Sequence, residues 1–234
     1  MYLHNYTLVM KNLLSSFRRS LSYFIGYFVL FVLFSIFCFS ISKADGFLLI
    51  NKFHTTFLDY FFVLFTNIGN GIFVIGITLV MLMRKKTGWA CQTVISFLVS
   101  GVIVQLFKHL MPSPRPKLFF GNEISIHCIH GITGTGSSSF PSGHSASVFA
   151  LTTLLCLYFS DKKSSFKLGL FFLLMAFLTG FSRIYLSQHF PIDVLAGSLI
   201  GMLVSLSVFI ILPVTLFEKK LSKNEWETQS VKLQ

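Results

Sequence analysis

Long apolar segments recur along the whole chain, and they restrict the folds that it can adopt. Six of them approach the roughly 20 residues that a membrane-spanning helix needs. The chain is 53% hydrophobic, with 29 Phe and a mean hydropathy of +0.74, which is typical of an integral membrane protein. The segments do not alternate with period 2, so helices are predicted rather than strands. The predicted spans are about Tyr23–Ser42, Tyr60–Met83, Trp89–Phe107, Gly143–Ser160, Phe166–Phe181 and Asp193–Phe217.

These spans take up most of the 234 residues, so a single domain is predicted. We expect an all-α, polytopic membrane protein: a six-transmembrane-helix bundle with short interfacial helices. Residues 1–21 are interpreted as an amphipathic leader on the cytoplasmic interface, with a flexible leader as the open alternative, and residues 218–234 as a cytoplasmic tail. The six-helix core is expected at 22–217, with functional loops at 108–142 and 182–192. No cleavable signal peptide is predicted, because the first span is long and no small-x-small site follows it.

The 19 Lys and Arg residues are distributed unevenly over the two sides of the predicted bundle. Thirteen lie before the first span, after the last, or in the loops between spans two and three and spans four and five. The positive-inside rule therefore places both termini in the cytoplasm. Topology and anionic lipid headgroups explain the net charge of +11, and nucleic-acid binding is not predicted. The other six lie on the periplasmic or lumenal side: Lys43, Lys52, Lys108, Arg115, Lys117 and Arg183.

Three short polar clusters interrupt the apolar sequence on this outer side. They are Lys108-x6-Arg115-Pro116, Pro141-Ser142-Gly143-His144 and Ser182-Arg183-x5-His189-x3-Asp193. Ionisable groups near a bilayer are costly and mark functional sites. Three cations beside two imidazoles suit a phosphate ligand, because Arg offers a planar fork of donors and Lys a point charge.

The second cluster predicts an anion site at a helix N-terminus. Ser142 precedes an apolar run and is expected to cap the helix, where free N–H groups and the helix dipole favour an anion. Gly143 lets a ligand approach the backbone closely, and His144 lies in the first turn beside it.

The third cluster predicts a histidine with an orienting carboxylate. Pro191 suits the first turn of the last helix, so His189 falls just outside that helix and Asp193 just inside. Asp193 can then accept from one imidazole N–H of His189. The other ring nitrogen is left free as a nucleophile.

All three clusters resemble the signature of the type 2 phosphatidic acid phosphatase family, membrane lipid phosphatases related to vanadium haloperoxidases. The pattern K-x6-R-P, P-S-G-H and S-R-x5-H-x3-D is matched at every fixed position. The resemblance implies that phosphate oxygens are bound by a set of five residues: Lys108, Arg115, Arg183, Ser142 and, through its backbone N–H, Gly143.

The resemblance also implies the catalytic roles. His189 would attack phosphorus to form a phosphohistidine, and Asp193 would orient His189. His144 would protonate the leaving oxygen and later activate water. No metal or other cofactor is expected, because the fixed cations supply the charge stabilisation that a metal would otherwise supply.

The implied activity is that of a lipid phosphatase at the periplasmic face of a bacterial-type inner membrane. Its partner would be a lipid phosphate monoester or pyrophosphate of the undecaprenyl pyrophosphate, phosphatidylglycerol phosphate, phosphatidic acid or lipid A class. The motifs do not separate these lipids and do not indicate an oligomeric state. Two alternatives stay open: a lipid-to-lipid phosphotransferase with the same site, and a non-catalytic lipid-binding or transport protein. The loop at 117–140 lies outside the signature and is a candidate for specificity.

Other histidines on the outer side suggest structural roles. His127-x2-His130 beside Cys128 has metal-ligand types, but no nearby carboxylate or second cysteine completes a set, so a solvated loop is favoured. His54 follows an amphipathic segment, and a structural interfacial role is favoured for it over a catalytic one.

Overall fold

The structure is a computed structural model of the chain, and it describes residues 11, 13–134, 136, 138–161 and 164–214. Within these residues the regular structure is helical, and the only β contact is an isolated bridge between Ser113 and Ser138. The all-α prediction is therefore confirmed. The helices are α2 (Leu21–Ser40), α3 (Lys43–Asn51), α4 (Thr56–Phe65), the 3₁₀ turn η1 (Thr66–Gly69), α5 (Gly71–Met83), α6 (Thr87–Leu110), α7 (Pro116–Phe120), α8 (Gly143–Tyr158), α9 (Ser165–Tyr185) and α10 (Pro191–Ile211).

Four helices of the described chain, α2, α6, α9 and α10, are each long and apolar enough to cross a membrane. A fifth candidate is the bent pair made by α4 with η1 and by α5. The remaining predicted span corresponds to α8, whose 16 residues make it shorter than the others. The membrane-helix character is confirmed, while the number of six spans stays a prediction.

The second predicted span, Tyr60–Met83, is not one straight helix. It begins earlier, at Thr56, and bends by 56° where the 3₁₀ turn η1 passes into α5 at Asn70. Asn70 is extended and caps α5 by accepting from the Ile72 N–H at 3.1 Å. Polar residues and glycines within an apolar run thus end one helix and start another. The polar side chains satisfy backbone groups that the break leaves without helical partners, and the glycines permit the change of backbone direction.

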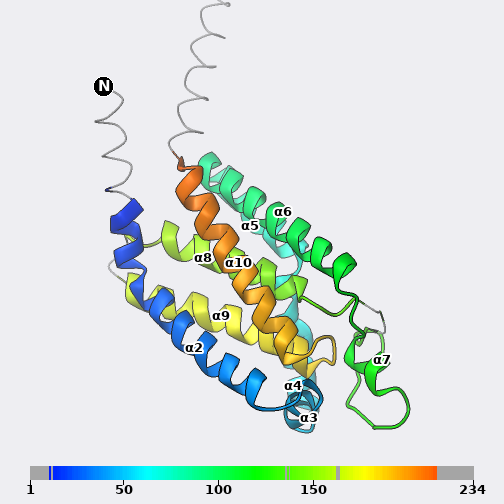
Figure 1. Cartoon of the computed structure of the whole chain (residues 1–234). Helices are drawn as coiled ribbons and strands as arrows, with labels where there is room; N and C mark the ends of the chain where they lie inside the picture. The colour runs from blue at the N-terminus through cyan, green and yellow to red at the C-terminus, as the bar shows by residue number, and fades with distance from the viewer. Residues whose placement is uncertain (1–10, 12, 135, 137, 162–163, 215–234) are drawn as a thin grey trace, which may run out of the picture.

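The helices form one bundle, with α2 and α9 side by side on one flank and α5 and α6 on the other (Figure 1). α8 is the central helix, and 12 of its 16 residues are buried. The start of α2 and the end of α10 lie at the same end of the bundle (Figure 1). The short helices α3, α4 and α7 lie at the other end, together with the loop that leads from α7 to α8.

Apolar side chains cover the outside of the bundle as well as its core. Phe28, Phe39 and Met83 expose 66%, 79% and 82% of their surface. A water-soluble protein rarely carries such a continuous apolar surface, whereas lipid tails solvate it without cost. Inside, hydroxyls pair across helices: the Tyr23 hydroxyl of α2 lies 3.0 and 2.9 Å from the hydroxyls of Thr152 and Thr153 of α8.

The predicted leader lies mostly outside the described residues. Residues 13–19 are helical, and the Arg19 guanidinium contacts the Asp161 carboxylate between α8 and α9. The predicted tail at 218–234 lies wholly outside the described residues.

Candidate functional site

The third cluster is held at the turn that joins α9 to α10. α9 ends at Tyr185, beyond the predicted end of the span at Phe181, whereas Pro191 takes the first position of α10 as the sequence predicts. The Asp193 carboxylate caps α10 by accepting from the Phe190 N–H at 2.9 Å. His189 is therefore fixed just before the helix, and its side chain is buried beside that of Asp193.

His189 and Asp193 are joined through a third residue, Ser139. The distance from His189 Nδ1 to Asp193 Oδ2 is 3.5 Å, longer than the direct hydrogen bond that the spacing predicts. The reason is that the same carboxylate oxygen already caps α10 and accepts from the Ser139 hydroxyl at 2.6 Å. That hydroxyl lies 3.4 Å from His189 Nδ1. Ser139 was not singled out by the sequence, because nothing distinguishes it from Ser137 and Ser138 before the fold is known.

Burial sets the protonation state of His189. Its side chain is removed from water, and this lowers the pKa of His189 to about 4, while the nearby negative charge of Asp193 acts in the opposite direction. The charges of Arg183 and Arg115 act in the same direction as burial. At neutral pH the imidazole is thus uncharged, with a lone pair on one ring nitrogen.

The second cluster begins α8, and Ser142 caps that helix as predicted. Its side chain accepts from the Ser145 N–H at 3.3 Å and from the Ser145 hydroxyl at 2.9 Å. The Ser142 N–H donates to the Asp193 backbone carbonyl at 2.9 Å. The N-termini of α8 and α10 are thereby tied together, and Gly143 and His144 lie in the first turn of α8 beside the His189 turn.

Two glycines of α10 allow this close approach. A Cβ on Gly197 would lie 2.4 Å from the Ser142 carbonyl oxygen, and one on Gly201 would lie 2.2 Å from the Ala146 carbonyl oxygen. Small residues four apart let two helix backbones meet in a membrane. The spacing Gly197-x3-Gly201 therefore brings the second and third clusters together.

Arg183 lies in the last turn of α9, with only 7% of its surface exposed. Its Nη1 donates to the Thr66 hydroxyl at 2.7 Å. Thr66 belongs to η1, so the break in the second apolar segment supplies a partner for this guanidinium. Arg183 Nε is buried and has no hydrogen-bond partner among the described residues. A buried donor of this kind points to a ligand or water that satisfies it.

The first cluster supplies the other two cations. Lys108 is half-buried in the last turn of α6. Arg115 precedes α7, where its N–H donates to the Gly136 carbonyl at 3.1 Å and Pro116 starts the helix. Its guanidinium donates to the Gln188 amide oxygen, next to His189. Burial lowers the pKa of Arg115, and Asp193 opposes that effect.

The cations of the first and third clusters lie near the histidine of the second. Arg183, Arg115 and Lys108 are all close enough for their charges to act on the His144 imidazole. Within the described residues none of the three cations has a carboxylate within ion-pair distance. A group of cations that lacks acidic partners is suited to attract an anion.

The loop between α7 and α8 is fastened to the same end of the bundle. The Asn51 side chain accepts from the His127 N–H at 2.8 Å and donates to its carbonyl at 3.2 Å. The Ser187 hydroxyl donates to that carbonyl at 2.6 Å. The Gln188 side chain donates to the Ile132 carbonyl while it accepts from Arg115. The loop thus holds Ser187 and Gln188, which directly precede His189, and Gln188 in turn contacts Arg115.

The histidines of this loop do not assemble a metal site in the described structure. His127 Nε2 lies 2.9 Å from Asp59 Oδ1, and its ring stacks on His54 at 4.1 Å. Among the described residues no group of three or more His, Cys, Asp or Glu side chains is placed to hold a metal ion. His54 thus packs against this loop, and its structural role at the membrane interface stays a prediction.

A family model described as the PAP2 superfamily matches residues 89–215, more than half of the chain. The chain belongs to the PAP2 superfamily. This membership confirms the resemblance that the three clusters suggest, and all of them lie within the matched residues. The structural elements outside the match, α2 to α5, supply Thr66, Asn51 and Asp59 to the end of the bundle that holds the clusters.

Several named proteins are similar to this chain. Lipid phosphate phosphatase 1 of Arabidopsis thaliana is 37% identical over 46% of this chain and 39% of its own length. Undecaprenyl-diphosphatase of Sulfolobus acidocaldarius is 30% identical over 70% of this chain and 75% of its own length. The chain spans about half the length, or less, of several curated relatives that it matches. A crystal structure of Aquifex aeolicus LpxE aligns with a TM-score of 0.60 and 26% identity, covering 70% of this chain and 93% of that one.

Proposed function

We propose that this protein hydrolyses the phosphate monoester or pyrophosphate of a membrane lipid. The observation that carries the proposal is the buried Arg183. Among the described residues its Nε has no hydrogen-bond partner, and no carboxylate lies within ion-pair distance of its guanidinium. With Lys108 and Arg115 it forms a three-cation site for the oxygens of a phosphate. The Ser142 hydroxyl and the Gly143 N–H at the start of α8 complete the proposed cradle.

His189 is the proposed nucleophile, because burial keeps its imidazole neutral and Ser139 and Asp193 fix its orientation. Its Nε2 forms a bond to phosphorus while the bond from phosphorus to the lipid-side oxygen breaks. His144 gives a proton to that oxygen. Water then attacks the phosphohistidine and returns a proton to His144, which releases inorganic phosphate and restores His189.

The lipid is proposed by class. The names of the relatives, lipid phosphate phosphatase and undecaprenyl-diphosphatase, support a lipid carrying a phosphate or diphosphate. The apolar outer surface of the bundle supports a substrate that remains in the bilayer while its headgroup reaches the site.

The membrane orientation is also a proposal. The charge distribution supports an inner-membrane protein with both termini in the cytoplasm and the site on the periplasmic face. Because the apolar spans take up most of the chain, we also propose one domain, with the leader at 1–21, the core at 22–217 and the tail at 218–234. In a cysteine-free background, Ser125→Cys should be labelled by an impermeant maleimide in intact cells. Ser164→Cys, between α8 and α9, should be labelled only after permeabilisation, and the reverse pattern would invert the orientation.

Phosphate release from a panel of lipid phosphates and diphosphates tests the function. We expect purified protein in neutral detergent to release inorganic phosphate from at least one of them, with EDTA having little effect, since fixed cations do the charge stabilisation. Vanadate, which mimics pentavalent phosphorus, should inhibit. Transfer of the phosphate to another lipid without release would favour a phosphotransferase, and binding without turnover a lipid-binding protein.

Variants of the two histidines test nucleophilic attack and proton transfer separately. His189→Ala should abolish turnover and the acid-labile phosphoenzyme. His144→Ala should slow turnover by roughly 10²- to 10⁴-fold, the usual contribution of a general acid. That loss should shrink for a nitrophenyl phosphate, whose leaving group needs little protonation. Near-normal activity of His189→Ala would require another nucleophile.

A further inference from the structure

Lys43 is a cation at this end of the bundle that belongs to none of the three clusters. It is the first residue of α3, directly after the capping Ser42. Its Nζ lies over two aromatic rings, 4.6 Å from the centroid of Phe119 and 5.0 Å from that of Phe190. Phe190 is buried and follows His189 in the chain. Lys43 is thus held beside the turn that carries the proposed nucleophile.

The charge of Lys43 is not neutralised by any acidic side chain that the structure describes. In the part of the chain that the structure describes, no carboxylate lies within ion-pair distance of it. Asp45, two residues further along α3, instead accepts from the Ser42 hydroxyl at 2.7 Å and belongs to the N-terminal cap of α3. Aromatic rings attract and orient an ammonium group, but they leave its charge free to act on an anion.

Lys43 lines a cavity of about 240 Å³ that borders two parts of the proposed site. One wall is the segment that joins Lys108 to Arg115, and the other is the start of α10 at Asp193. The Asp193 carboxylate oxygen Oδ2 accepts from Ser139 and Phe190, so it is engaged within the protein. The cavity is lined by Lys43, Met111, Pro112, Ser113, Phe140, Ile192 and Asp193.

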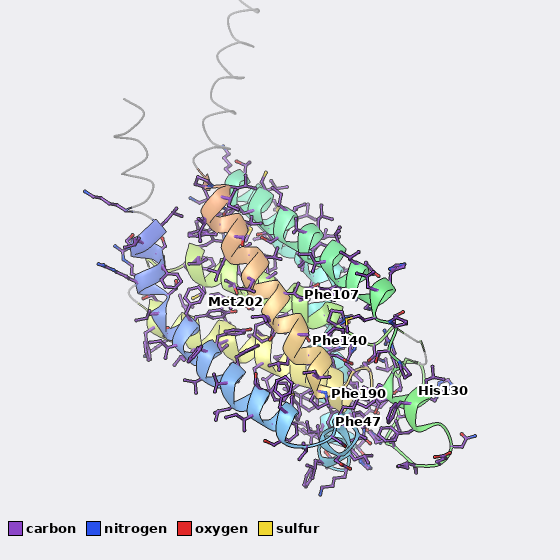
Figure 2. The ribbon with its side chains drawn as sticks, viewed as in Figure 1. Phe47, Phe107, His130, Phe140, Phe190 and Met202 are labelled. Atoms are coloured by element: carbon purple, nitrogen blue, oxygen red, sulfur yellow. The ribbon has the colours of Figure 1, made fainter. Side chains whose placement is uncertain are left out.

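The rest of the lining suits an amphiphile that enters from the bilayer. Met111, Pro112 and Phe140 are apolar, while Lys43 and Ser113 are polar. Phe140 packs edge-on against Phe107 of α6, with ring centroids 6.3 Å apart. Figure 2 shows Phe107, Phe140, Phe190 and Phe47 one after another at this end of the bundle, with His130 on the loop farther out. The polar part of a lipid headgroup can therefore reach Lys43 while its apolar part stays on this aromatic side.

We propose that Lys43 binds the second phosphate of a lipid diphosphate, so that it selects diphosphates over monophosphates. This inference rests on the proposed function. When His189 bonds to the terminal phosphorus, the bond from that phosphorus to the bridging oxygen breaks, and the lipid leaves as its monophosphate. Lys43 then faces the negative charge that builds up on this leaving phosphate. Water resolves the phosphohistidine as for any other substrate.

A second lysine, at the other end of α3, gives the test a matched control. Lys52 directly follows α3 and is exposed; its Nζ lies 5.0 Å from the centroid of the Phe53 ring, and it does not line the cavity. The variants Lys43→Gln, Lys43→Arg and Lys52→Gln are assayed in micelles of an uncharged detergent, which removes attraction between the substrate and a charged surface. The substrates are two lipids with the same isoprenoid chain, one ending in a monophosphate and the other in a diphosphate.

We expect Lys43→Gln to lower kcat/KM for the diphosphate about 10-fold more than for the monophosphate, as the loss of one charge-assisted contact predicts. Lys43→Arg should keep most of the preference, and Lys52→Gln should change neither substrate. Phe119→Leu, which keeps the apolar packing but removes one ring under the ammonium, should cause a smaller loss in the same direction.

Equal effects of Lys43→Gln on both lipids, or no effect, would overturn the inference and leave Lys43 as an interfacial lysine. A selective loss of diphosphate turnover in Lys52→Gln, as large as that in Lys43→Gln, would also overturn the inference, because it would assign the effect to general surface charge. If Lys43→Gln does not fold, Lys43→Arg and Phe119→Leu still decide, through the ratio of the two substrates. Failure of the wild-type protein to release phosphate from either lipid would instead count against the proposed function.

Discussion

The Ser139 hydroxyl donates to Asp193 Oδ2 over 2.6 Å, and its oxygen lies 3.4 Å from His189 Nδ1. Ser139 and Asp193 lie 54 positions apart in the chain. The serine therefore links the loop before α8 to the first turn of α10. It stands where a direct contact between the histidine and the carboxylate was predicted.

Replacement of Ser139 should affect turnover more than substrate binding. Ser139→Ala removes one partner from both His189 and Asp193, while the three cations are unchanged. We expect kcat to fall about 10-fold with little change in KM, in line with the net value of one buried hydrogen bond. Ser139→Thr, which keeps a hydroxyl, should retain more activity than Ser139→Ala. Ser138→Ala is the control, and an equal fall there, or a change confined to KM, would contradict the role.

The burial of His189 should make stability depend on pH between about 4 and 6.5. The pKa of His189 is lowered to about 4 in the folded protein, whereas an unfolded chain has a histidine pKa of about 6.5. Between these values the unfolded state binds the proton and the folded state does not, so stability falls as the pH is lowered through this window. Above pH 6.5 this contribution is fully present.

The measurement is the Tm of the detergent-solubilised protein at pH values from 4 to 7. His189→Gln, which cannot titrate, should show a flatter decline than the wild-type protein. The control His130→Gln changes an exposed histidine and should keep the wild-type slope. An unchanged slope in His189→Gln would mean that the histidine is not buried in its neutral form.

Gly134 should be needed for the position of Arg115. A Cβ at Gly134 would lie 2.4 Å from Arg115 Nη1 and 3.0 Å from the Gln188 amide oxygen. Gly134→Ala would displace the guanidinium, so we expect KM to rise several-fold with a smaller change in kcat. Gly136→Ala is the matched control, because its Cβ would come no closer than 3.9 Å, to Arg115 Nε. Wild-type KM in both variants would show that the loop does not position Arg115.

Gly201 should be required for the packing of α10 against α8. A Cβ there would meet the Ala146 carbonyl oxygen at 2.2 Å and the Ala150 N–H nitrogen at 2.9 Å, and neither backbone atom can rotate away. Gly201→Ala should therefore lower Tm and activity together. Gly76→Ala in α5 meets nothing within 4 Å and should stabilise the helix by up to about 1 kcal/mol. A Tm for Gly201→Ala at or above the wild-type value would refute the tight helix contact.

The sequence predicts much of the fold because spans depend on local composition. A long run of apolar residues predicts a membrane helix from composition alone. Pro191 at a first helical position and Ser142 at an N-cap predict where two helices begin. The bend at Asn70 was missed, because hydropathy averages over the short polar interruption. The sequence there, Asn67-x-Gly69-Asn70-Gly71, was the available signal.

The candidate site likewise contains residues that the sequence predicts and residues that it does not. Its cations, histidines and carboxylate stand out because they are rare on an apolar chain. Their supporting residues do not: Thr66, Ser139 and Gln188 are common polar types whose importance comes from contacts over 117, 54 and 73 positions. Such contacts are set by how helices pack, and no local pattern encodes them.

Arg183 Nε, buried without a partner in the described structure, has a consequence for the end of the proposed reaction. Leaving such a donor unsatisfied costs about 1–3 kcal/mol, and a bound phosphate removes that cost whether it is still attached to a lipid or already free. In the proposed reaction, the contact that recruits the substrate would thus also retain the product. We therefore expect a high affinity at this nitrogen to slow the departure of inorganic phosphate, so that one guanidinium governs both the rate of each cycle and the sensitivity to accumulated phosphate.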